Sequence, residues 1–131
     1  MRALLALDGS PSSRAASELA ASLAWSSGSI IDVVGVVATS TEAGPARQQL
    51  EEMLDDAAAA LTGESRVVRR TTLVGRAGSV LVELAADLRA ELVILGSRGR
   101  GPLRSMLLGS VSAEVVDHAP CPVLVVPTRR T

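Results

Sequence analysis

The sequence has 131 residues, 47% of them hydrophobic, which is long enough for one domain, residues 1–131, with a core of its own. Acidic and basic residues nearly balance at 14 and 13, and 1% are aromatic, so the chain offers nucleic acid and anionic membranes neither an attractive field nor stacking platforms. The single Cys121, the lack of a leader-like start and the short apolar runs predict a cytoplasmic protein with no membrane or nucleic-acid partner.

Runs rich in aliphatic and β-branched residues alternate with segments whose apolar residues recur at helical spacing. Strands are expected at residues 2–8, 30–38, 66–74, 91–96 and 121–127. Helices are expected around residues 15–23, 50–61, 80–88 and 110–118. This alternation predicts an α/β fold, in which an open five-stranded parallel sheet carries helices on both faces and right-handed crossovers connect the strands.

Two of the predicted strands have the character of edge strands. The third contains Arg69, Arg70 and two threonines, whereas the first and fourth are continuously apolar, as strands buried on both faces are. The last strand is short and apolar between Pro122 and Pro127, which suits the end of a sheet. An apolar edge needs a cover. We therefore expect a homodimer through residues Pro122 to Pro127.

Several common chemistries are excluded by residue type. A Walker-type phosphate loop needs a lysine, which the chain lacks, and the glycines do not match GxGxxG. One histidine and one cysteine do not make a conventional zinc site, and no metal site is expected. Ser110 and His118 lie about 12 Å apart along a helix, too far for a catalytic pair. Cys121 is expected to be an inert thiol, and the carboxylates Glu51, Glu52, Asp55 and Asp56 a solvated helix face.

Polar residues follow the first predicted strand in the segment DGSPS. Asp8, Gly9 and Ser10 fall where an open parallel sheet binds ligands, outside the carboxyl ends of its strands. The same residues also suit a turn and a helix cap ahead of Pro11. The sequence leaves both interpretations open, and they are compatible with each other.

A glycine- and arginine-rich segment, GSRGRGPLRSMLLGSVS, follows the fourth strand. Gly96 and Gly99 would let a ligand approach the backbone, and Arg98 and Arg100 supply permanent positive charge. The amides of Gly109, Ser110 and Val111 would point outward from the start of a helix, where phosphate binds well. A flexible connector is the alternative, but the position between strand and helix favours a polyphosphate site.

These residues resemble the universal stress protein family. Its nucleotide motif is a glycine, two residues, a second glycine, nine residues, then a glycine followed by Ser or Thr, and it reads here as Gly96, Gly99, Gly109 and Ser110. The segments DGSP, LLGSVS and PVLVVP are also typical of the family, and the likeness runs essentially end to end. The resemblance implies a sheet of strand order 3-2-1-4-5, of the adenine nucleotide alpha hydrolase type, that dimerises through its last strand.

The resemblance also implies ATP, with Mg²⁺, as the ligand. It places Asp8 near adenine and ribose, the backbone of Val36 at adenine, and Gly96 near ribose and phosphate. The phosphate contacts are implied at Gly99, Gly109, Ser110 and Val111, and Ser112 adds a possible second hydroxyl. Roles for Arg98 and Arg100 follow from their charge. The motif does not distinguish ATP from ADP, AMP or a cyclic nucleotide.

The function expected from these features is that of an ATP-binding stress-response or regulatory protein with no dedicated catalysis. Slow ATP hydrolysis or phosphoryl transfer is a second hypothesis, for which Asp8 is the available water activator. A third is a dimeric interaction module that does not bind nucleotide.

Overall fold

A computed structural model describes residues 1–98 and 108–128. Its elements alternate as β1 (Arg2–Leu7), α1 (Pro11–Ser22), β2 (Ser29–Val37), α2 (Pro45–Leu61), β3 (Arg66–Val74), α3 (Ala77–Asp87), β4 (Leu92–Gly96), α4 (Ser110–His118) and β5 (Val123–Val126). The predicted strands and helices are confirmed. The start of α2 lies upstream of its first periodic leucine, because a polar first turn opens at Pro45. Within the described residues, none of the helices is long and apolar enough to cross a membrane.

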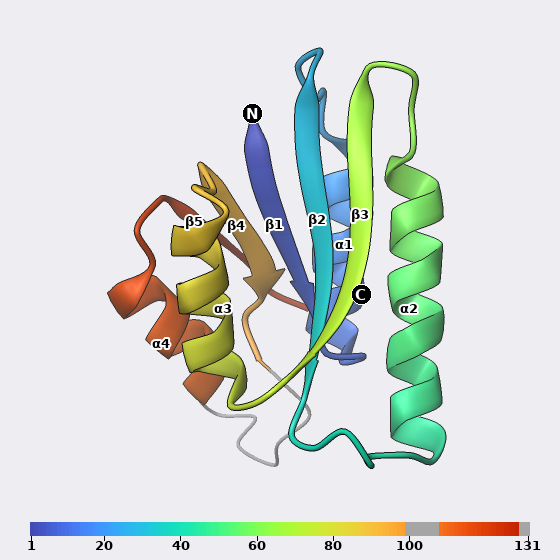
Figure 1. Cartoon of the computed structure of the whole chain (residues 1–131), viewed down its shortest axis with the longest axis vertical. Helices are drawn as coiled ribbons and strands as arrows, with labels where there is room; N and C mark the ends of the chain where they lie inside the picture. Colours follow the sequence, from blue (N-terminus) through green and yellow to red (C-terminus); the bar gives the residue numbers. More distant parts are fainter. Residues whose placement is uncertain (99–107, 129–131) are drawn as a thin grey trace.

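All the strand pairs in the sheet are parallel, and the order is β3-β2-β1-β4-β5, as predicted. Figure 1 shows the strands running in one direction, so that their carboxyl ends gather at the lower edge of the view. The strand order reverses direction at β1, whose neighbours are β2 and β4. The chain leaves these central strands in different directions there, which opens a crevice at the carboxyl ends.

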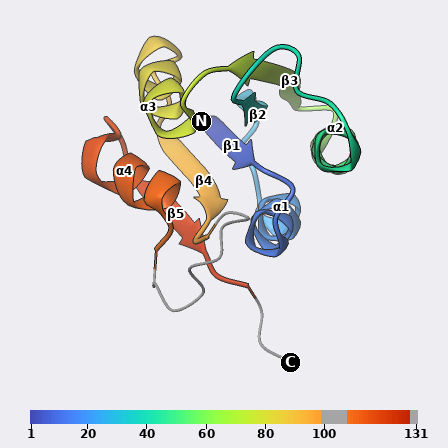
Figure 2. The ribbon, with the colours of Figure 1, turned by 90° about the horizontal axis from the view of Figure 1, so that it is seen from below.

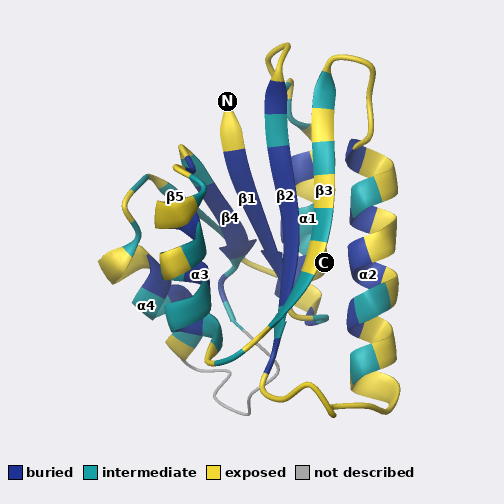
Figure 3. Cartoon of the chain, in the orientation of Figure 1, coloured by how far each residue is buried: buried dark blue, intermediate teal, exposed yellow. Residues whose placement is uncertain are grey.

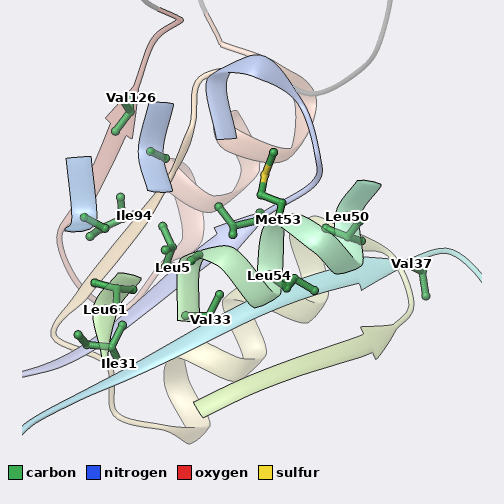
Figure 4. Packing of buried hydrophobic residues seen from close by; sticks show 14 residues of the cluster. Leu5, Ile31, Val33, Val37, Leu50, Met53, Leu54, Leu61, Ile94 and Val126 are labelled. Carbon is green, nitrogen blue, oxygen red and sulfur yellow. The ribbon is translucent and has the colours of Figure 1, made fainter. Parts of the chain in front are cut away.

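Each face of the sheet is covered by two helices (Figure 2). On one face α1 and α2 pack on β1 and β2, and Figure 4 shows the aliphatic side chains of this cluster, including Leu5, Val33 and Leu54. On the other face α3 and α4 enclose a second cluster that includes Leu4, Val93 and Val115. The packing of the two helical layers on the sheet holds the starts of the helices in place around the crevice.

The edge strand β3 is tied to α2 by charge. Burial alternates along β3, whereas β1 is almost wholly buried (Figure 3). Arg70 pairs with Glu51 and Asp55 of α2, and Glu51 also accepts hydrogen bonds from Arg47 and Thr72. These contacts, Arg70 above all, hold the pKa of Glu51 below its ordinary value. The expectation of a solvated helix face was therefore wrong for Glu51, whereas Asp55 stays exposed while pairing with Arg70.

Candidate functional site

A pocket opens at the carboxyl ends of the central strands, the position at which open parallel sheets bind ligands. Its volume is about 470 Å³ with the open mouth included. The lining residues come from β1, β2, β4, the connections that follow β1 and β4, and the first turns of α1, α3 and α4. They are Ala6, Leu7, Asp8, Ser10, Ser13, Val34, Val36, Ala77, Leu81, Leu95, Gly96, Arg98, Val111 and Ser112.

The lining divides by chemistry according to the element that supplies it. Every lining residue of β2 and α3 is apolar, namely Val34, Val36, Ala77 and Leu81. The polar lining residues lie in the β1–α1 connection, in the first turn of α1, just after β4 and in α4. The pocket therefore offers an apolar wall suited to a planar ring and a polar region suited to a charged group.

The segment after β1 forms a turn that caps α1. The Oδ1 atom of Asp8 accepts a hydrogen bond of 2.8 Å from the amide of Ser10, and the hydroxyl of Ser10 caps the helix by accepting from the amide of Ser13 at 3.2 Å. Pro11 occupies the first helical position. The turn-and-cap interpretation is confirmed, and Asp8 and Ser10 nevertheless line the pocket. Gly9, between them, has a φ of 84°, which favours glycine.

Two serines at the start of α1, the N-cap Ser10 and Ser12, hold the chain where it leaves β4. The carbonyl oxygen of Arg98 accepts hydrogen bonds from the hydroxyls of Ser10, at 3.2 Å, and Ser12, at 2.5 Å. The amide of Arg98 donates to the same Ser12 oxygen at 3.2 Å. The backbone at Arg98 is therefore held in place beside the pocket that the residue helps to line, and its side chain carries a permanent positive charge.

The start of α4 is fastened to the end of β4 through Ser97. The carbonyl oxygen of Ser97 accepts from the amide of Gly109 at 2.7 Å and from the hydroxyl of Ser112 at 2.7 Å. The Ser112 hydroxyl also donates to the carbonyl of Gly109 at 3.1 Å. The expectation that the Gly109 amide points outward for phosphate was therefore wrong, because the protein uses it internally.

The amides of Ser110 and Val111 belong to the first turn of the same helix. Gly109 is the N-cap of α4, and no side chain caps the helix among the described residues. Helix geometry gives the amides of Ser110 and Val111 no intrahelical acceptor. Val111 lines the pocket, whereas Ser110 is exposed and does not. Ser112 lines the pocket but is buried, with its hydroxyl proton engaged.

Gly96 lines the pocket, and its position requires glycine for a packing reason that the sequence did not suggest. Among the described glycines, those with positive φ are Gly9, Gly28, Gly44 and Gly75, so Gly96 has an ordinary backbone conformation. It ends β4 directly beneath the first turn of α1, where a side chain would overlap Ser12 and Ser13. The missing Cβ is needed for helix–strand packing as well as for any approach by a ligand.

The predicted site residues are thus brought together in part. The predicted residues that line the pocket are Asp8, Ser10, Val36, Gly96, Arg98, Val111 and Ser112. Gly9, Gly109 and Ser110 lie beside it without lining it, and Gly99 and Arg100 lie outside the described residues. The lining residues missed from the sequence are Ala6, Leu7, Ser13, Val34, Ala77, Leu81 and Leu95. Most are apolar and carry the same sequence pattern as core residues, so no signal separated them.

Ionisable groups are few in this lining. In the described part of the chain Asp8 is the only acidic lining residue and Arg98 the only basic one. No group of three or more His, Cys, Asp and Glu residues within residues 1–98 and 108–128 could hold a metal ion. Burial raises the pKa of the Cys121 thiol, which favours its protonated form, as expected of an inert thiol.

Together, the strand order, the two helical layers and the pocket at the reversal point define an open α/β protein with a pocket at its topological switch point. The model of the universal stress protein family matches residues 1–127. The chain belongs to this family.

Relatives of known sequence and structure agree with this membership. A universal stress protein of Thermus aquaticus is 40% identical over 85 residues, which cover 65% of this chain and 61% of that protein. The chain spans between about a third and three fifths of the length of the curated relatives that it matches first.

Solved structures show the same fold over the whole chain. The structure of the hypothetical protein MJ0577 superposes with a TM-score of 0.80 at 20% identity, covering 99% of this chain and 97% of that one. A crystal structure of a universal stress protein in complex with cAMP has a TM-score of 0.73 at 29% identity, with 98% of each chain covered.

Proposed function

We propose that the pocket binds an adenine nucleotide, with ATP and Mg²⁺ as the leading candidates. The observation that carries this proposal is the division of the lining into an apolar wall from β2 and α3 and a polar region at two helix starts. Adenine would lie against Val34, Val36 and Leu81. The phosphates would lie toward Arg98 and the start of α4, where amides favour anions. The relative that binds cAMP supports the same class of ligand.

We propose a regulatory rather than a catalytic role for this site. Phosphoryl transfer needs a group that positions or activates the attacking oxygen. Asp8, the only acidic residue in the described lining, holds the Ser10 amide through Oδ1. Nucleotide occupancy would instead order the starts of α1, α3 and α4 together and so alter the surfaces beside them. Phosphate release by the purified protein that Asp8→Ala abolishes would favour the hydrolase hypothesis.

A homodimer through β5 is part of the proposal. β5 pairs with β4 alone among the described strands, and its Val123, Leu124 and Val125 remain half-buried rather than buried. A second copy that added its own β5 would cover this apolar edge. The proposed nucleotide site lies one strand away, at the end of β4. The dimer interface and the nucleotide site would therefore both be built on β4.

Thermal unfolding with and without nucleotide tests the proposal. A ligand at 100 times its dissociation constant adds about 2.7 kcal/mol to the stability of the folded state, which raises the midpoint of a domain of this size by a few degrees. We expect that rise with ATP and Mg²⁺, and we expect adenine nucleotide to copurify with the protein. The same measurement with ADP, AMP and cAMP ranks the candidates.

Two phenylalanine variants of α3 locate the binding. Ala77→Phe places a ring in the pocket, whereas Ala86→Phe places the same ring on the exposed side of the same helix. The ATP-dependent rise should disappear in the first variant and persist in the second. No rise in the wild-type protein at millimolar ATP would refute nucleotide binding and leave the interaction module as the function.

A further inference from the structure

An ion pair of matched geometry joins the starts of α3 and α4. The Nη1 atom of Arg76 lies 2.6 Å from Oε1 of Glu114, and its Nη2 atom lies 2.7 Å from Oε2. Arg76 is the N-cap of α3, and Glu114 lies in the second turn of α4. Two parallel hydrogen bonds from one guanidinium to one carboxylate fix both position and orientation.

The pair lies at the edge of the pocket, where the apolar wall from α3 meets the start of α4, and neither of its residues is part of the lining. Arg76 immediately precedes Ala77, a lining residue. Glu114 follows Ser110 by four positions and Val111 by three, so its side chain shares their side of α4. Glu114 therefore stands about one turn from the amides proposed to receive phosphate.

Glu114 is seated against α3 because Gly78 has no side chain. A Cβ built on Gly78 would lie 2.2 Å from Oε1 of Glu114. The carboxylate is consequently directed toward Arg76 by packing as well as by charge. Hydrogen bonding to Arg76 also lowers the pKa of Glu114, which favours the charged carboxylate.

An unpaired carboxylate at this position would oppose phosphate binding. The start of a helix attracts anions through its partial positive charge, and a fixed negative charge one turn away cancels much of that attraction. A guanidinium paired with the carboxylate removes the opposition while the carboxylate remains in place. A purely mechanical link between α3 and α4 is the competing explanation, and it predicts no dependence on ligand charge.

We propose that Arg76 is a specificity-determining residue, an inference that rests on the proposed function. By neutralising Glu114 beside the proposed phosphate region, Arg76 lets the pocket accept nucleotides with several phosphates. Arg76 does not touch the base in this scheme. Its contribution grows with the negative charge of the ligand, from adenosine through AMP and ADP to ATP. Unit charges about 7 Å apart in water change affinity roughly threefold per ligand charge.

Calorimetric titration of adenosine, AMP, ADP and ATP into four proteins tests this. They are the wild type, Arg76→Gln, Glu114→Gln and the double variant. Arg76→Gln should leave the affinity for adenosine unchanged and lower the affinity for ATP by about tenfold or more. The losses of affinity for AMP and ADP should lie between these two. The double variant should return to wild-type affinity for ATP, and the loss in Arg76→Gln should shrink in high salt.

The outcomes separate this proposal from the one it rests on. If the wild type binds none of the four ligands, the proposed function fails and takes this inference with it. If the wild type binds ATP but Arg76→Gln weakens all four ligands equally, or if the double variant is no better than the single one, the pair is only a mechanical link. Unfolding midpoints of the ligand-free variants show whether each is folded when titrated.

Discussion

Gly96 and Ser12 lie so close together that no side chain fits between β4 and α1. A Cβ on Gly96 would lie 2.4 Å from the Ser12 hydroxyl oxygen, 2.6 Å from the Ser12 carbonyl carbon and 2.6 Å from the Ser13 amide nitrogen. Two of these three atoms belong to the backbone of a helix start and have no room to move. The wall of the pocket at this point is therefore main chain packed on main chain.

Gly96→Ala should destabilise the fold by about 3 kcal/mol, because the added methyl group has to push α1 away from the sheet. Gly35→Ala is the matched control: its Cβ would meet the side-chain ends of Leu54, at 2.9 Å, and Leu50, at 3.2 Å. Those ends rotate, so we expect a loss of about 1 kcal/mol there. Urea denaturation measures both, and equal losses would contradict the packing argument.

Gly109→Val should abolish nucleotide binding and leave the fold intact. Gly109 has a φ of −73° and a ψ of 172°, which valine adopts without strain. Its added bulk would stand at the N-cap of α4, directly before the amides proposed to bind phosphate. Titration with ATP measures the loss, and thermal unfolding without ligand checks the fold. Unchanged affinity would show that the phosphates lie elsewhere.

Glu51→Gln should lower stability at pH 7 by about 1 kcal/mol, since Glu51 joins α2 to β3 through a network rather than a single exposed pair. Its pKa is depressed in the folded protein, chiefly by Arg70, so its contribution is complete above the ordinary glutamate value of about 4.3 and is lost as the pH falls through the depressed value. The free energies of unfolding of the wild type and of Glu51→Gln should therefore converge as the pH is lowered.

Glu52→Gln is the control for this experiment, because Glu52 is the next residue along α2 and is exposed. Urea unfolding between pH 7 and pH 3 measures wild type and both variants. A constant gap between wild type and Glu51→Gln across that range would mean that the carboxylate's charge is irrelevant.

Val125→Pro should weaken dimerisation through β5. The carbonyls of Pro122 and Val126 accept from β4, so in a parallel ladder Val123 and Val125 direct their own amides to the open edge. Proline removes one such amide per subunit, and two hydrogen bonds of about 1 kcal/mol each correspond to roughly thirtyfold in the dimer dissociation constant. Val125→Thr keeps the amide and should retain wild-type association. Sedimentation equilibrium distinguishes the variants, and unchanged association of Val125→Pro would refute an edge-to-edge dimer.

The fold could be predicted because its signals are local. The continuous apolar runs of β1 and β4 and the polar composition of β3 specify which strands are central and which is an edge, and the structure has them in those places. The helices followed from periodic leucines and alanines. The starts of α2 and α3 lie upstream of the expected positions, because their first turns carry no leucine of the periodic pattern.

The site could be predicted only where a residue's type reveals its use. Asp8 and Arg98 are polar at strand ends and were found. Val34 and Leu81 line the pocket, but their residue types and spacing are those of core residues. Nothing in the sequence distinguishes an apolar residue that borders a pocket from one that is packed on all sides. The fate of the Gly109 amide depends on the carbonyl of Ser97, a partner that only the folded chain brings near.

Ser97 has one more consequence. Its amide donates to the carbonyl of Val126 in β5, while its carbonyl holds Gly109 and Ser112 of α4. The backbone of a single residue after β4 therefore contacts the proposed dimer strand through its amide and the proposed phosphate-binding helix through its carbonyl. A displacement of β5 or α4 by a fraction of an ångström would therefore be transmitted to the other element through the backbone of Ser97, without a change in side-chain packing.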